Sequence, residues 1–385
     1  MKSFSVQPRK RIAVNTRFLI KDKLEGIGLF TAESLKRIVL NHPEIDFYFL
    51  FDRPYTSEFI FSDNVVPVVL FPQARHPFLW YWWFEISVKN WLARNKPNLF
   101  LSTDGYGCLG TSVQQLLVMH DLSFEHFTDG VPILTQKYYR YFMPRYAQIA
   151  SRIATVSEFS KKDIVSHYQI NPQKIDVVYN GAKEVYQPIT EETKQKVKYK
   201  YADSKDYFIY VGSIHPRKNV KNLLLAFEKF KTETGALHML LIVGRKAWDF
   251  GDVEEAYEQM KHKNSVKFLG HIPSEDLAKL VAGAFAMVYV SLFEGFGIPI
   301  VEAMSCCVPV ITSNTTSMPE AAGDAAILVN PKSVDEISLA MKALTENDEL
   351  RNSLIEKGTL QIRKFSWQQT ADKLWSSCEK VLNNL

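Results

Sequence analysis

The chain of 385 residues is 46% hydrophobic and 23% charged, a composition that is typical of a globular protein and excludes a disordered or fibrous one. Its length predicts two domains, or three. The net charge of +4 is uneven, because residues 1–186 hold 22 Lys and Arg against 17 Asp and Glu, whereas the remainder holds 24 against 25. The excess of five in the first half is too small to indicate nucleic-acid binding.

Cysteine usage and hydropathy indicate the compartment. Cys108, Cys306, Cys307 and Cys378 show no metal-ligand spacing, and no apolar stretch is long enough to span a bilayer. The basic N-terminal residues are followed by no long apolar segment, so a signal peptide is not expected. We therefore expect a soluble cytoplasmic protein.

The first half alternates short apolar strands with helices. Strands are expected at 11–15, 47–51, 65–70, 99–102, 116–119 and 153–156, and helices at 29–40, 79–93 and 132–149. This alternation is typical of a parallel sheet covered on both faces. Residues 182–205 are polar and charged and are expected to connect two domains, with a surface helix as the alternative for the second half of that segment.

The same alternation restarts in the second half. Strands are expected at 207–211, 239–243, 266–269, 285–290, 308–311 and 326–329, and helices at 219–231, 274–282 and 299–305. The fold class is therefore α/β, with two doubly wound units. Ligands of such sheets bind where the carboxyl ends of strands lead into helix N-termini, so a cleft between the two sheets is the expected site.

The segment SLFEGFGIPIVEAMSCC is the most informative one, because it follows an apolar strand and opens a helix at Pro299. Gly295 and Gly297 form a loop where bare backbone can approach a ligand, and the N–H groups at the helix start suit a diphosphate. Glu294 and Glu302 are seven residues apart and can face one pocket from the loop and the helix. A carboxylate accepts two hydrogen bonds, which suits the vicinal hydroxyls of a sugar or ribose. The alternative is a surface Glu that the helix dipole favours.

This pattern, with its continuation VPVITSNTTSMPEAAGDAAILVNP, resembles the signature of retaining GT-B glycosyltransferases, in particular family 4. The resemblance implies that Glu294 contacts the donor sugar and Glu302 the nucleotide ribose. It also implies that the backbone of Phe296 and Gly297 lies near the sugar and the phosphates.

The resemblance also implies a domain plan. Two Rossmann-like domains, residues 1–185 for the acceptor and 186–364 for the nucleotide sugar, face each other across a cleft. Residues 365–385, which begin with FSW, form a C-terminal helix that crosses back onto the first domain.

A second motif, GSIHPRKN, stands between the first strand and first helix of the second unit. Two adjacent cations before a helix would neutralise a diphosphate leaving group. The family resemblance points to Lys218 as the main diphosphate contact, with Arg217 in support, and a solvated turn is the alternative. Ser213 stands where many relatives carry Arg, which leaves the charge to these two residues. We expect His215 to be incidental.

Three weaker motifs complete the predicted site. His120 follows a strand in the first unit, where the family places a His against the donor sugar, and Asp121 either orients it or caps the next turn. Gly28, in LEGIGL, resembles the family's loop beside the acceptor and diphosphate, with an ordinary flexible loop as the alternative. Gly270 and Ile272 resemble the turn that contacts the nucleobase.

Residues 75–94 contain four of the seven Trp residues. We favour a core helix with acceptor-side aromatics for this segment, and an interfacial helix on the inner membrane face is the alternative. There is no Asp-x-Asp motif and no cluster of His, Cys and carboxylates at metal-ligand spacing. We therefore expect no metal and no cofactor besides the nucleotide-sugar donor.

The family resemblance implies a hexosyltransferase that retains the anomeric configuration. The variants EGFGIPIVEAM and HPRKN look most like those of bacterial mannosyltransferases of surface polysaccharide pathways. GDP-mannose is therefore the first candidate donor, and a saccharide or lipid-linked saccharide is the expected acceptor. A nucleotide-sugar epimerase of the same architecture and a non-catalytic binding module are the alternatives.

Overall fold

The computed structural model describes residues 9–128, 131–245 and 251–383. It divides into two compact units, of which unit 1 comprises residues 1–179 and 367–385, and unit 2 comprises residues 180–366. The sequence analysis places the boundaries after residues 185 and 364, close to these positions.

Unit 1 is built on a parallel seven-stranded sheet in the order β3-β2-β1-β4-β5-β6-β7. Its strands are β1 (Arg11–Asn15), β2 (Asp46–Phe51), β3 (Val65–Val69), β4 (Leu99–Ser102), β5 (Gln115–Val118), β6 (Arg152–Thr155) and β7 (Ile175–Val177). Six of them match the predicted strands to within one residue, and β7 adds a seventh.

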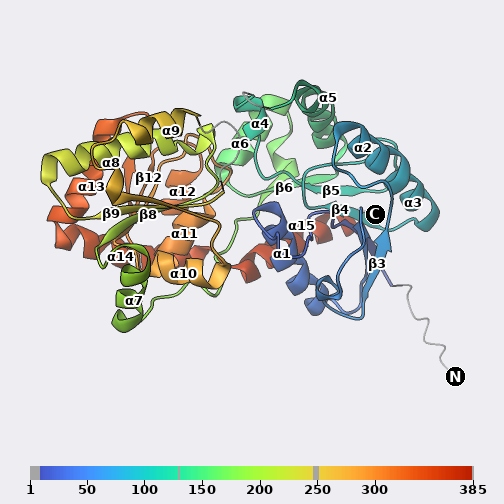
Figure 1. Cartoon of the computed structure of the whole chain (residues 1–385). Coiled ribbons are helices and arrows are strands. Elements are labelled where there is room, and N and C mark those ends of the chain that lie inside the picture. Colours follow the sequence, from blue (N-terminus) through green and yellow to red (C-terminus); the bar gives the residue numbers. More distant parts are fainter. Residues whose placement is uncertain (1–8, 129–130, 246–250, 384–385) are drawn as a thin grey trace. The chain divides into compact units, whose positions relative to one another are not determined.

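Helices cover both faces of this sheet (Figure 1). They are α1 (Ile27–Asn41), α2 (Pro77–Trp82), α3 (Lys89–Asn95), α4 (Ser123–His126), α5 (Ile133–Ile149), α6 (Glu158–Tyr168) and α15 (Trp367–Leu382). The C-terminal helix α15 packs against α1 and contacts β4, β5 and β6, whereas α2, α5 and α6 lie on the opposite face.

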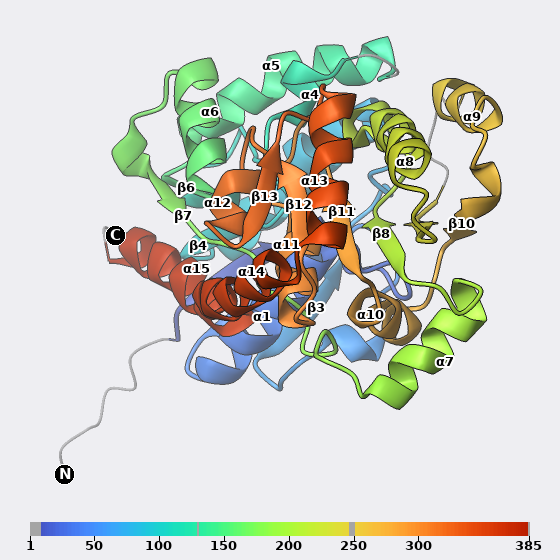
Figure 2. The same cartoon turned by 90° about the vertical axis from the view of Figure 1, so that its left-hand side faces the viewer.

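Unit 2 repeats this plan with a parallel sheet of six strands, in the order β10-β9-β8-β11-β12-β13. The strands are β8 (Tyr207–Val211), β9 (Met239–Val243), β10 (Val266–Gly270), β11 (Ala286–Tyr289), β12 (Val310–Ser313) and β13 (Ala326–Val329). The helices are α7 (Glu191–Tyr201), α8 (Val220–Thr234), α9 (Gly251–Glu258), α10 (Ser274–Ala282), α11 (Ile298–Ser305), α12 (Met318–Ala322), α13 (Val334–Glu346) and α14 (Asp348–Gln361). Helices α8 and α13 pack together on one face of the sheet (Figures 1 and 2).

Two predicted elements differ from the structure. The strand expected at 308–311 is found at 310–313, because the N–H of Val308 still donates to the carbonyl of Ala303 and so closes the end of α11. The segment 182–205 is not a plain connection, since α7 occupies most of its second half, as the alternative interpretation held. Thr190 caps α7 by accepting the N–H of Thr193, which explains where the helix begins.

Most of the aromatic segment 75–94 lies in a continuous helical stretch over residues 77–95, with a π-helical turn over Trp83–Val88. Trp83, Phe84 and Val88 are fully buried, which confirms the core interpretation for one face. The other face keeps large side chains in solvent, with Phe78 68% and Trp82 54% exposed. In the part of the chain that the structure describes, no helix combines the length and apolarity needed to cross a bilayer.

Candidate active site

The loop between β11 and α11 holds the predicted carboxylate Glu294 in a fixed position. Gly297 adopts a φ of 101° as the residue before the helix, a conformation that favours glycine, and a Cβ there would lie 3.0 Å from Ile300 Cδ1. Ser317 donates its hydroxyl to the carbonyl oxygen of Glu294 at 2.8 Å. The loop is thus tied down at its backbone, and the Glu294 side chain is left for other partners.

Those partners are the two predicted cations. Lys218 Nζ lies 2.6 Å from Glu294 Oε1, and Arg217 Nη1 lies 3.1 Å from Glu294 Oε2. Tyr289, the last residue of β11, donates its hydroxyl to Oε1 at 2.9 Å and accepts a hydrogen bond from Lys218 at 3.0 Å. Arg217 also donates to the carbonyl of Phe293 at 2.6 Å. The structure therefore brings together Glu294, Lys218 and Arg217 and adds Tyr289, which the sequence analysis did not single out.

The charges of this cluster control its protonation. Burial by itself would raise the pKa of Glu294, but the nearby Lys218 and Arg217 outweigh it and lower that pKa to about 2. Glu294 is therefore a carboxylate at neutral pH. Its single negative charge offsets one of the two positive charges, so Glu294, Lys218 and Arg217 together keep a net charge of +1. An incoming diphosphate can take over these cations and leave Glu294 to accept hydrogen bonds from sugar hydroxyls.

His215 has a structural task in the loop, and its expected lack of a role in binding stays a prediction. Its Nδ1 accepts the N–H of Arg217 at 3.2 Å and caps the 3-10 turn Pro216–Lys218. Asn219, at a φ of 61°, then turns the chain into α8 and donates to the carbonyl oxygens of Val290 and Pro331. These contacts hold the backbone of the loop and so fix the direction in which the side chains of Arg217 and Lys218 project from it.

Glu302 lies one turn into α11 and is 7% exposed. Burial raises the pKa of Glu302 to about 7, although Lys183 and a hydrogen bond from Tyr186 partly oppose the rise. Tyr186 lies more than a hundred residues earlier in the chain, so no local spacing indicates this contact. Phe296, between the two carboxylates, is buried and meets Phe365 edge to face at 5.2 Å.

Glu302→Gln is expected to stabilise the fold in a pH-dependent way. The unfolded carboxyl keeps its ordinary pKa near 4.5, whereas the folded one titrates at about 7, so the wild type loses stability as pH rises through this window. At ~1.4 kcal/mol per pKa unit, the advantage of the variant should grow by about 2 to 3 kcal/mol between pH 5 and pH 8. Urea unfolding at both pH values measures this. The exposed Glu356→Gln on α14 is the control, and an advantage that does not grow with pH would contradict the burial of a charged Glu302.

Three glycine loops meet at the carboxyl ends of β8, β9 and β10. The N–H of Gly244 donates to the carbonyl of Gly270 at 2.8 Å, and a Cβ on Gly244 would lie only 1.8 Å from the carbonyl oxygen of Gly212. The absence of side chains therefore lets the loops touch. Gly270 has a φ of 66°, and Ile272 follows two residues later as a half-buried side chain.

In unit 1, His120 is held at the end of β5 by its neighbours. Its Nε2 lies 2.9 Å from the carbonyl oxygen of Thr103, and its ring meets Phe30 of α1 edge to face at 4.9 Å. Because a carbonyl only accepts, Nε2 carries the proton, and the Nδ1 of the neutral ring is an acceptor. Burial lowers the pKa of His120, so the neutral form prevails at pH 7. Asp121 accepts the N–H of Ser123, so it caps the turn rather than orienting the histidine.

Gly28 and a buried ion pair shape the same unit. A Cβ on Gly28 would lie 2.8 Å from the carbonyl oxygen of Phe18, which explains the glycine by close packing. Arg17 pairs with Asp104, and both are buried, with the Arg17 guanidinium over the Tyr106 ring at 4.1 Å. The two residues are 87 apart in sequence, and the sequence analysis missed them.

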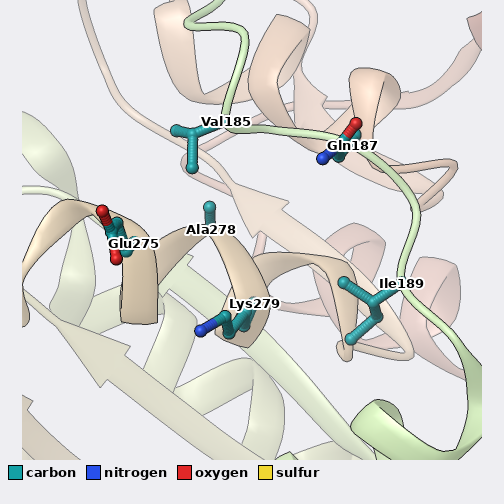
Figure 3. A pocket seen from close by; sticks show the side chains of 6 residues that line it. All are labelled: Val185, Gln187, Ile189, Glu275, Ala278 and Lys279. Carbon is teal, nitrogen blue, oxygen red and sulfur yellow. The ribbon is translucent and has the colours of Figure 1, made fainter.

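A shallow pocket of unit 2 lies outside the predicted site (Figure 3). It is lined by Val185, Gln187 and Ile189 from the segment before α7 and by Glu275, Ala278 and Lys279 of α10. Tyr186, between two of these residues in sequence, bonds instead to Glu302. None of the predicted site residues lines this pocket.

Two family models and several known proteins match this chain. The family model described as Glycosyltransferase Family 4 matches residues 31–183, and the one described as Glycosyl transferases group 1 matches residues 191–361. The O-antigen chain mannosyltransferase B of Escherichia coli is 33% identical over 250 residues, which are 65% of this chain and 66% of that protein. The O-antigen chain mannosyltransferase RfbU of Salmonella typhimurium is 24% identical over 286 residues, 74% of this chain and 75% of that protein.

A solved structure shows the same fold. HepE of Anabaena, in complex with UDP and glucose, superposes with a TM-score of 0.73 at 17% identity and covers 96% of this chain and 99% of its own. Both units are thus Rossmann-like domains of the GT-B type. Because the two family models together span most of both units, the chain belongs to the glycosyltransferases of family 4 and group 1.

Proposed function

We propose that the chain transfers mannose from GDP-mannose to a saccharide or lipid-linked saccharide acceptor in surface polysaccharide synthesis. The observation that carries the chemistry is the cluster of Glu294, Lys218 and Arg217, in which a carboxylate holds two cations ready for an anionic group. The names of the O-antigen mannosyltransferases that match the chain support mannose as the sugar.

The proposed mechanism follows from the charges of the cluster. The nucleoside diphosphate leaves toward Lys218, Arg217 and the N-terminus of α11, which together stabilise the developing negative charge. Glu294 accepts hydrogen bonds from the sugar, and the free Nδ1 of His120 accepts one from a sugar hydroxyl. A carboxylate with a pKa of about 2 between two cations is a weak nucleophile. This favours same-face transfer with retention over a double displacement through Glu294.

The remaining assignments complete the proposed donor site. Glu302 is assigned to the nucleotide ribose, Phe296 and Gly297 to the sugar and phosphates, and Gly270 and Ile272 to the base. Gly28 is assigned to the loop near the diphosphate. The cations replace a metal clamp, so we propose that transfer requires no metal and no further cofactor.

A panel of nucleotide sugars, offered with and without lipid-linked saccharides, tests the proposal. Acceptor-dependent release of GDP from GDP-mannose is the expected result. Acceptor-dependent release of UDP from UDP-glucose would contradict GDP-mannose as the donor. Conversion of the sugar without an acceptor would favour an epimerase. Binding without turnover would favour a non-catalytic binding module.

We further propose that the protein works in the cytoplasm, with the exposed face of α2 resting on the inner membrane surface. Phe78 and Trp82 are exposed there, and Tyr141 of α5 is 52% exposed, so the apolar side chains extend over two packed helices. Aromatic side chains favour the interface between lipid and water. The double variant Phe78→Ser, Trp82→Ser should lose most co-sedimentation with anionic vesicles, whereas Tyr199→Ser, a 79% exposed residue of α7, should not. Equal sedimentation of all three proteins would contradict the contact.

A further inference from the structure

Three potential metal ligands meet in unit 1 outside the predicted site. His126 ends α4, and Asp163 and His167 lie one turn apart on α6. His126 Nε2 lies 3.0 Å from each carboxylate oxygen of Asp163, and His167 Nδ1 lies 3.1 Å from Oδ1 of the same carboxylate. The three ligand atoms all lie within 4.8 Å of one another. The sequence does not reveal this group, because His126 stands 37 residues before Asp163.

The spacing of these atoms suits a transition metal. Zinc binds imidazole nitrogen and carboxylate oxygen at about 2.0 to 2.2 Å, so two of its ligands lie about 3 to 3.5 Å apart. The three nitrogen–oxygen separations of 3.0 to 3.1 Å are at the short end of that range. The two rings, with centroids 4.9 Å apart at 73°, meet edge to face rather than stacking. Two histidines and one carboxylate form a ligand set that zinc and iron use, with further positions left for water.

The surroundings of the group also suit an ion that enters from solvent. The Asp163 side chain is 7% exposed, whereas those of His126 and His167 are 32% and 39% exposed. The carboxylate is therefore held by the protein, and the two imidazoles form the open side. Other histidines that pair with a carboxylate, such as His262 with Glu228, belong to no such group of three among the described residues.

We propose that His126, Asp163 and His167 bind one divalent transition metal ion of the zinc class. The ion takes His126 Nε2, His167 Nδ1 and a carboxylate oxygen of Asp163, and water completes its coordination. Each ring nitrogen that now donates to Asp163 gives up its proton on binding, either to the other nitrogen of its ring or to solvent. The ion would join α4 to α6, and α4 begins three residues after His120.

Metal titration of the purified full-length chain tests the proposal. The protein is stripped with EDTA, the chelator is removed, and Zn²⁺ and Co²⁺ are titrated calorimetrically in a Cys307→Ser background, since Cys307 is the cysteine that is not fully buried. We expect one ion per chain. His126→Ala and His167→Ala should each weaken its binding at least tenfold, and His262→Ala should leave it unchanged.

Thermal unfolding gives a second measurement that does not depend on activity. Zn²⁺ should raise the Tm of the parent protein and of His262→Ala, but not that of His167→Ala. Circular dichroism shows whether the alanine variants keep the fold. If His167→Ala does not fold, His167→Gln is used in its place. Absence of one-to-one binding, or equal binding by parent and variants, would overturn the proposal and leave the three residues as a hydrogen-bonded group.

Discussion

Glu294→Gln is expected to reduce sugar transfer by about 100- to 10,000-fold while nucleoside diphosphate binding is kept or strengthened. In the wild type, the carboxylate lies 2.6 Å from Lys218 and 3.1 Å from Arg217, so a diphosphate bound there as proposed would compete with it for both cations. Glutamine keeps the shape but carries no charge. The cations are then free for the diphosphate, whereas the sugar loses a charged acceptor at the reacting centre.

Two measurements separate this role from a structural one. Steady-state kinetics give the loss of transfer, and calorimetry with GDP gives the nucleotide affinity. The variant should also unfold at a lower temperature without nucleotide, because two half-buried cations lose their counter-charge, and GDP should restore more Tm than it does in the wild type. The exposed Glu356→Gln serves as the matched control. Wild-type transfer rates would refute the assignment of Glu294, and parallel loss of GDP binding would refute its displacement by diphosphate.

Much of the fold is predictable from the sequence because parallel strands and glycine loops are local signals. The apolar runs at β1, β8 and β9 match their predicted bounds to the residue, since nearly all of their residues are buried. The bounds of β13 match as well, although Leu328 in that strand is 39% exposed. Helices with weaker patterns are harder to predict. For example, α14 is long but mostly polar, and its position depends on its packing against α11 and α13.

The residues of the candidate site also differ in whether a local sequence signal indicates them. The carboxylate of Glu294 and the two cations stand in short motifs, so sequence alone suggests all three. Tyr186 reaches Glu302 through tertiary packing, and no spacing along the chain indicates that contact. Tyr289 is only five residues before Glu294, but a tyrosine at the end of an apolar strand looks like an ordinary core residue until the loop folds back onto it. Asp163 looks like an ordinary helix residue until the fold brings His126 beside it.

The second large effect is expected at Lys218. Lys218→Ala should lower kcat by about 100- to 1,000-fold, because the variant removes a 12% exposed ammonium that would meet the charge developing on the leaving diphosphate. The loss should be greater in kcat than in GDP affinity, since Arg217 and the start of α11 still bind the ground state. Lys218→Arg should recover part of the rate, because it keeps the charge but changes the hydrogen-bond geometry.

The same substitution has a consequence for Glu294 that can be measured independently. Removing the nearest cation leaves burial less opposed, so the pKa of Glu294 rises from about 2 toward its ordinary value. The carboxylate stabilises the fold at pH values above the pKa of its unfolded form, and this stabilisation is lost as pH falls through the pKa of its folded form. When the folded pKa is higher, the stabilisation is lost at a higher pH. Lys218→Ala should therefore unfold at a higher pH on acid titration than the wild type.

The control is Lys221→Ala, in which an exposed lysine of α8 is removed. It should match the wild type in both kcat and acid stability. A Lys218→Ala variant whose defect lies wholly in KM would show that Lys218 binds the donor without stabilising the leaving group.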